Sequence, residues 1–135
     1  MSTILVGTDT SAAADLAVQD AARLARDRGA ELVVVYVRPN GDLRTVVDPD
    51  RAADPSAYLA KIPTRFPDIP TRTLIETGNP AERICDLAAT EGADTIVLGN
   101  RGVHGSRWAV KDSVPNIVLR HSPCSVLIVD TRRAQ

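Results

Sequence analysis

The sequence predicts an α/β fold built on an open parallel sheet with helices on both faces. Short apolar runs alternate along the chain with segments whose apolar residues recur at helical spacing, and this alternation is typical of βαβ units. The run Leu32–Val37 reads Leu-Val-Val-Val-Tyr-Val without polar alternation, which indicates a strand covered on both faces. Because 135 residues is the size of one domain, residues 1–135 are expected to fold as a single domain.

The first third of the chain predicts one βαβ unit. Thr3–Val6 is a short apolar run of β type. Ser11 follows as a helix cap, and the Ala-rich segment Ala12–Arg28 carries one apolar face at helical spacing. Gly29 stands where a left-handed residue ends a helix. The two-sided strand Leu32–Val37 completes the unit.

The next segment, Arg38–Pro70, is a connection with little regular structure. Six prolines and several acidic residues interrupt it. Only Ser56–Arg65 is expected to carry a short helix, and Pro63 would cut that helix short because proline cannot donate a helical hydrogen bond.

The following strand and helix are marked by clear boundaries. Thr71–Thr77 is predicted as a strand, and its charged residues indicate an edge or half-exposed position. Asn79 as N-cap, Pro80 at the first helical position and Glu82 in the first turn predict a helix that runs to about Glu91.

The last third adds two strands and one helix. Thr95–Leu98 is an apolar strand, and a glycine-containing loop follows from residue 99 to about 112. Ser113 can cap a helix over Val114–His121, and Ser125–Val129 is the final strand. The predicted order is βαβ(α)βαβαβ, a three-layer α/β/α arrangement with five strands.

Composition limits the class of partner. The chain has 16 basic and 17 acidic residues, so nothing in its charge requires a nucleic acid or a membrane. It has no apolar run of membrane-spanning length and no leading signal segment, so the expected compartment is the cytoplasm. Cys85 and Cys124 form no metal-type motif and are expected to be buried apolar residues, with a disulfide or a metal site as the weaker alternative.

Candidate site residues lie where the predicted strands end, since an open parallel sheet binds ligands beyond the carboxyl ends of its strands. Three segments meet this condition: Gly7-Thr8-Asp9, Tyr36-Val37, and the stretch from Leu98 to Ser113. The third runs from a strand into a helix start, where free N–H groups suit a phosphate. The alternative is a solvated loop with glycines for its turns. The charged residues of this loop are Arg101, Arg107, Lys111 and Asp112.

Familiar nucleotide and hydrolase fingerprints are absent from the sequence. No GxxxxGK[ST] loop occurs, and Gly99, Gly102 and Gly105 do not match the GxGxxG spacing of dinucleotide sites. No GxSxG elbow supports a serine hydrolase. Trp108, within the same loop, either covers the site or anchors the loop to the body.

The sequence resembles the universal stress protein family, and the resemblance covers the whole chain except roughly residues 38–70. The family pattern is a GxxG, nine residues and a glycine-serine pair, followed later by a Pro-Cys-x-Val type last strand. The matching segments are Ile4–Ser11, Gly78–Ile84, Ala93–Gly99, Gly99–Gly102, Asp112–Val114 and Ser122–Val129.

This resemblance implies a Rossmann-like, five-stranded sheet of the adenine-nucleotide alpha-hydrolase type, often dimeric through the last strand, and a site for ATP or another adenine nucleotide, with Mg²⁺ where ATP is bound. By position, Asp9 and Val37 would touch the adenosine portion, and Leu98 would line its pocket. The ribose and the phosphates would lie against Gly99, Gly102, Ser113 and the Val114 backbone, with Gly7, Thr8 and Arg101 nearby.

One residue departs from the nucleotide-binding branch of the family, which has glycine where this chain has Asp112. A carboxylate near a phosphate is repelled, and even about 1.5 kcal/mol of repulsion weakens binding about tenfold. Arg101, Arg107 and Lys111 can offset that charge or pair with Asp112.

Three functions are consistent with these observations. The first is a regulatory adenine-nucleotide-binding module of the stress response without significant turnover. The second is a nucleotide-independent dimeric interaction protein of the same family. The third is a slow ATPase, which is the weakest because no residue is placed as a general base.

Overall fold

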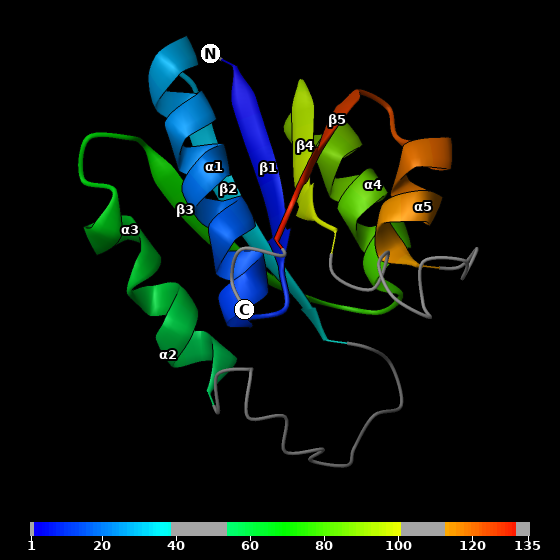
Figure 1. Ribbon diagram of the computed structural model, residues 1–135, viewed down its shortest axis with the longest axis horizontal. Helices are drawn as coiled ribbons and strands as arrows, with labels where there is room; N and C mark the ends of the chain where they lie inside the picture. Colours follow the sequence, from blue (N-terminus) through cyan, green and yellow to red (C-terminus); the bar gives the residue numbers. More distant parts are fainter. Residues whose placement is uncertain (1, 39–53, 101–112, 132–135) are drawn as a thin grey trace.

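A computed structural model describes residues 2–38, 54–100 and 113–131 of the chain. This part of the chain contains five strands and five helices, in the predicted order except that two helices instead of one lie between the second and third strands (Figure 1). The elements are β1 (Thr3–Thr8), α1 (Ala12–Arg28), β2 (Glu31–Arg38), α2 (Pro55–Ala60), α3 (Ile62–Arg65), β3 (Thr71–Thr77), α4 (Pro80–Glu91), β4 (Thr95–Gly99), α5 (Val114–His121) and β5 (Ser125–Val129).

The strands form one sheet in the order β3-β2-β1-β4-β5, and every pair of neighbours is parallel. The α/β fold with a five-stranded parallel sheet is therefore confirmed. β3 lies at one edge, as its charged residues predicted, and β5 lies at the other. The chain runs outward from β1 to β3, then returns to place β4 on the opposite side of β1. The topological switch point thus falls between β1 and β4.

Two hydrophobic clusters hold the three layers together. One cluster joins the sheet to α1, α2 and α3, with Val34, Ala21 and Ile62 fully buried within it. The other joins the opposite face to α4 and α5 and includes Val33 and Val118. Figure 1 shows α1 on one side of the sheet and α4 and α5 on the other. The central strands read as continuous apolar runs because both of their faces are covered.

The helix boundaries follow the predicted caps. The Ser11 Oγ accepts the N–H of Ala14 at 3.0 Å, and the Asn79 Oδ1 accepts the N–H of Glu82 at 3.1 Å. Gly29 has φ 63° and Gly92 has φ 65°, the left-handed conformation that closes a helix without a Cβ penalty. Strong local signals therefore fix both ends of α1 and α4.

The prediction of a single short helix over Ser56–Arg65 is wrong, because the structure has two helices, α2 and α3, separated at Lys61. Pro63 carries no N–H, so it cannot continue the hydrogen-bond ladder of α2. The N–H of Lys61 bonds instead to the carbonyl of Tyr58, three residues back, at 3.3 Å.

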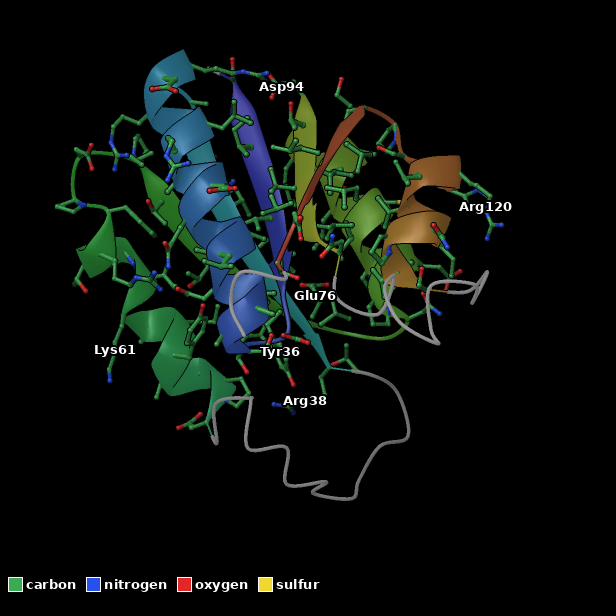
Figure 2. All side chains as sticks on the ribbon, in the orientation of Figure 1. Tyr36, Arg38, Lys61, Glu76, Asp94 and Arg120 are labelled. Atoms are coloured by element: carbon green, nitrogen blue, oxygen red, sulfur yellow. The ribbon has the colours of Figure 1, made fainter. Side chains whose placement is uncertain are left out.

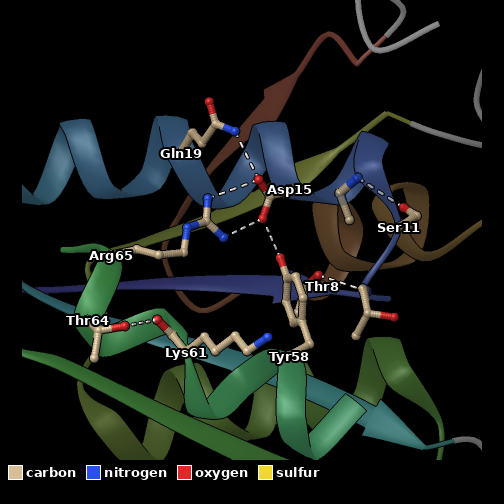
Figure 3. Close-up of polar contacts among 10 residues, drawn as sticks. Thr8, Ser11, Asp15, Gln19, Tyr58, Lys61, Thr64 and Arg65 are labelled. Carbon is tan, nitrogen blue, oxygen red and sulfur yellow. Dashed lines mark hydrogen bonds and ion pairs between the residues drawn. The ribbon is translucent and has the colours of Figure 1, made fainter. Parts of the chain in front are cut away.

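α2 and α3 dock on α1 through the carboxylate of Asp15 (Figure 3). Arg65 donates to both carboxylate oxygens, at 2.7 and 3.0 Å. Gln19 donates at 2.9 Å, and the Tyr58 hydroxyl donates a fourth hydrogen bond. Burial and the bond to Asp15 raise the pKa of Tyr58 to about 12. The Asp15 side chain therefore holds both short helices against α1.

The cysteines differ from the expectation. Cys85 and Cys124 are half-buried free thiols that pack against the cluster beneath α4 and α5, rather than fully buried core residues. Burial raises the pKa of the Cys85 thiol, and the nearby Asp86 and Cys124 raise it further.

Candidate functional site

The candidate site lies at the carboxyl edge of the sheet, where β1 and β4 part. These two strands pair only from Ile4 and Thr95 to Val6 and Val97. Beyond that point β1 stays paired with β2 as far as Thr8, and β4 stays paired with β5 as far as Gly99. The sheet therefore splits at its switch point, which is where open α/β sheets bind ligands. We call this split the β1–β4 crevice.

Figure 2 identifies the two sides of the sheet on which the strands begin and end. Tyr36, Arg38 and Glu76 mark the side where the strands end, which we call the carboxyl edge, and Asp94 marks the side where they begin. The predicted segments at the ends of β1, β2 and β4 all meet at the carboxyl edge, because parallel strands end on the same side.

The β1–α1 connection forms the first wall of the crevice. The Thr8 Oγ1 accepts the N–H of Thr10, and the Asp9 Oδ1 accepts the N–H of Ser11, both at 2.9 Å. Asp9 is half-buried and serves as a turn former in its own loop, the alternative to a ligand contact. This turn holds the Asp9 carboxylate just beyond the carboxyl end of β1.

Thr10 is a residue of this wall that the sequence did not reveal. It has φ 70°, which is unusual for a β-branched residue, and it is buried. Strained backbone of this kind is concentrated at functional sites and persists only where the surroundings hold it. No local sequence signal marks the conformation, since threonine normally avoids it.

The floor of the crevice is apolar. Val37 and Leu98 are buried in the cluster beneath α4 and α5, at the ends of β2 and β4. A Cβ added at Gly7 would stand 2.9 Å from Ile84 Cδ1 and 3.0 Å from Leu98 Cδ2. The close packing of these side chains thus accounts for glycine at this position. Ile84 joins the predicted residues as part of the floor.

The start of α5 supplies polar groups. Ser113 occupies the N-cap position with extended backbone, but its side chain makes no capping bond, contrary to the predicted cap. Its Oγ is one of two buried side-chain polar atoms without a hydrogen-bond partner among the residues described. Pro115 has no N–H, so the backbone donor at the very start of α5 is the N–H of Val114, which precedes the first intrahelical acceptor and has no partner within the helix. The Ser113 hydroxyl and this N–H therefore lie together at the helix start.

The end of β4 carries a contact between distant parts of the chain. The Asn100 Oδ1 accepts two hydrogen bonds from Thr131, from its N–H at 3.0 Å and from its Oγ1 at 2.9 Å. A Cβ at Gly99 would stand 2.8 Å from Thr131 Cγ2. Packing against Thr131 thus explains the glycine at residue 99 without a ligand. Asn100 lies within the predicted stretch from Leu98 to Ser113, but its contact with Thr131 was not predicted.

Three predicted site residues, Arg101, Gly102 and Asp112, lie outside the described residues, as does Trp108. Within the ranges that the structure covers, no group of three or more His, Cys, Asp or Glu side chains is placed to hold a metal. None of the helices in those ranges is long and apolar enough to span a bilayer.

Comparison with known proteins identifies the family. The sequence pattern of the Universal stress protein family matches residues 1–130. A universal stress protein of Synechocystis sp. is 32% identical over 132 residues, which cover 94% of this chain and 84% of that protein. A solved universal stress protein in complex with cAMP is 28% identical, with a TM-score of 0.81 over 96% of this chain and 97% of that one. The universal stress protein UspA from Lactobacillus plantarum is 28% identical, with a TM-score of 0.77 over 95% of this chain and 97% of that one. On these grounds the chain belongs to the universal stress protein family.

Proposed function

We propose that this protein binds an adenine nucleotide, ATP with Mg²⁺ in the first instance, in the β1–β4 crevice and acts as a regulatory module without significant turnover. The observation that carries the proposal is the start of α5, where the Ser113 Oγ is buried, has no hydrogen-bond partner among the described residues and lies beside the first N–H of the helix, that of Val114. A buried hydroxyl without a partner is costly, and a phosphate oxygen would satisfy it.

The remaining residues fit the parts of such a ligand. Asp9 and Val37 would contact the adenosine portion, and Leu98 would line its pocket above the apolar floor. Ser113 and the Val114 N–H would hold phosphate at the helix start. The remaining proposed contacts are Gly7, Thr8, Gly99, Arg101, Gly102 and Asp112. The similar structure solved with cAMP supports the ligand class.

The geometry favours a sensor over an ATPase. The Asp9 Oδ1 already accepts a backbone hydrogen bond from Ser11, which makes Asp9 a part of its turn rather than a base aimed at a water. Regulation in this scheme depends on occupancy of the crevice by nucleotide. We further propose that the protein is cytoplasmic and forms a homodimer through β5, without a nucleic-acid or membrane partner.

The first test is a thermal-melt titration of the purified protein at low salt with Mg-ATP, AMP and cAMP. A ligand at 100 times its Kd adds about 2.7 kcal/mol to the free energy of unfolding. For a domain of this size the melting temperature should rise by about 5–10 °C. No shift with any nucleotide at millimolar concentration would contradict the proposal and favour the nucleotide-independent interaction protein.

A second test addresses Asp112, the residue behind that alternative. If its carboxylate repels phosphate, Asp112→Gly should bind Mg-ATP about tenfold more tightly. Isothermal titration of the variant and the wild type measures the difference. Equal affinities would show that Asp112 is no obstacle to the nucleotide.

A further inference from the structure

We infer that Asn100 and Thr131 form a polar clasp that positions one wall of the β1–β4 crevice and thereby strengthens adenine-nucleotide binding. The inference rests on the proposed function of the crevice. The clasp joins the residue after β4 to the segment that leaves β5, which lie 31 residues apart in the sequence. The clasp acts through the position of this wall, so we assign Asn100 and Thr131 as positioning residues.

The wall in question is the carboxyl end of β4, which pairs with another strand on one side only. Leu98 and Gly99 pair with Ile128 and Val129 of β5, whereas the pairing with β1 has already ended at Val97. A central strand is normally held by hydrogen bonds on both sides. The backbone hydrogen bonds at the end of β4 therefore come from β5 and not from β1.

The clasp supplies the missing restraint. The Asn100 N–H donates to the Val129 carbonyl at 3.0 Å, which extends the β4–β5 ladder by one bond. The Asn100 Oδ1 then accepts both the N–H and the hydroxyl of Thr131. Asn100 is 8% exposed and Thr131 is 5% exposed. Because an unmade bond is costly at buried positions, both groups are held in one arrangement.

The same contact determines the shape of the wall. The Thr131 methyl fills the space beside Gly99, where a Cβ would stand 2.8 Å away. A wall held in its binding geometry before the nucleotide arrives spares the ordering cost during binding. Loss of the Thr131 hydroxyl should therefore weaken nucleotide binding more than its effect on stability alone would explain.

The test compares two buried threonines associated with the same strand. Thr131→Val keeps the shape of the side chain and removes its hydroxyl bond at the carboxyl end of β4. Thr95→Val removes a hydroxyl bond at the amino end, where Thr95 is 4% exposed and its Oγ1 accepts from the charged Arg28 at 3.0 Å. We expect a loss of thermal stability in both variants, but a Kd for AMP or Mg-ATP that rises about fivefold to tenfold only in Thr131→Val. Isothermal titration measures both nucleotides.

The conservative variant Thr131→Ser keeps the hydroxyl bond to Asn100 and loses only the methyl beside Gly99, so its Kd should rise less than that of Thr131→Val. If the wild type binds and Thr131→Val binds equally tightly, the clasp has no role and the proposed function stands. Equal weakening in Thr95→Val also overturns the clasp, because general destabilisation then explains the effect. A wild type that binds neither nucleotide overturns the proposed function and the clasp with it.

Discussion

At the scale of single residues, Asp15 connects both short helices to α1 and therefore leads to a specific prediction of stability. Burial raises the pKa of its carboxyl, but hydrogen bonds from Arg65, Tyr58 and Gln19 outweigh burial and hold that pKa below its ordinary value. Asp15→Asn removes the charge that these donors share. We expect a loss of about 1–2 kcal/mol in the free energy of unfolding at neutral pH, measured by chemical denaturation.

The sign of the pH dependence follows from the lowered pKa. The contribution of Asp15 is complete above its unfolded pKa of about 3.9 and is lost as pH falls through the folded value. Asp15→Asn should therefore show a flatter loss of stability in acid. Asp86→Asn is the control, since the Asp86 side chain is 63% exposed and its i,i+3 ion pair with Arg83 on α4 should contribute less than about 0.5 kcal/mol. Equal effects of the two variants would contradict this account.

Two glycines of the crevice make a second prediction at the residue scale. Gly99→Ala should cost about 1–3 kcal/mol, because its Cβ would meet the Cγ2 of the clasped Thr131 at 2.8 Å. Gly7→Ala should cost less, because its nearest neighbour is the end of the flexible Ile84 side chain at 2.9 Å. Melting temperatures of both variants measure the difference.

The source of the Gly99 strain has a direct test. Thr131→Ser removes the Cγ2 methyl, so in that background Gly99→Ala should lose most of its cost. If the two substitutions are additive instead, the alanine at residue 99 is destabilising for a reason other than Thr131.

At the scale of elements, the N-cap serines of α1 and α5 lead to opposite predictions for a serine-to-alanine substitution. Ser11→Ala should cost about 1 kcal/mol, because the Ser11 Oγ caps the N–H of Ala14. Ser113→Ala should change stability by less than about 0.5 kcal/mol, because its Oγ makes no bond in the described structure. The same Ser113→Ala should weaken nucleotide binding about tenfold, since a hydrogen bond to a charged phosphate is lost.

Chemical denaturation measures the stability of Ser11→Ala and Ser113→Ala, and nucleotide titration measures the Kd of each variant. Stability losses of equal size would assign Ser113 a structural role as a cap. An unchanged Kd in Ser113→Ala would remove this serine from the phosphate site, whatever its effect on folding.

Elements were predictable where local signals were strong. Asn79, Pro80 and the left-handed Gly92 define α4 from the sequence because caps act within one turn. The division of α2 from α3 at Lys61 was not predicted, and Pro63, which was expected to cut the helix short, instead lies in the first turn of α3. A short helix gains little from propensity, so tertiary contacts such as those of Asp15 decide whether it resumes.

At the scale of the whole molecule, the sequence predicted the sheet better than the site. Uninterrupted apolar runs such as Leu32–Val37 indicate strands that are buried on both faces, and the helices between the strands indicate a parallel order. The predicted residues Val37 and Leu98 both lie at the carboxyl ends of their strands, on the same side of the sheet. The strained Thr10 and the Asn100–Thr131 clasp were missed because long-range packing creates them, and no local pattern records such contacts.

The two edges of the sheet differ in how they resist association. β3 carries Arg72, which pairs with Glu31 at 2.9 Å and also with Glu91, and charged edges discourage strand addition. β5 carries no charge from Ser125 to Val129, and its Leu127 is 41% exposed. An uncharged, exposed edge strand is suited to pairing with its own copy across a two-fold axis. The contrast favours β5 as the surface of the proposed homodimer.

The last prediction tests that surface with two matched substitutions. Leu127→Lys places two like charges near the axis of a β5–β5 dimer, so the protein should elute as a monomer and its mass by light scattering should halve. Ile75→Lys is the control, because Ile75 is 43% exposed on the opposite edge strand, β3. It should leave the mass unchanged. If Ile75→Lys alone dissociates the dimer, the interface lies on β3, and a wild type of monomer mass would exclude both edges.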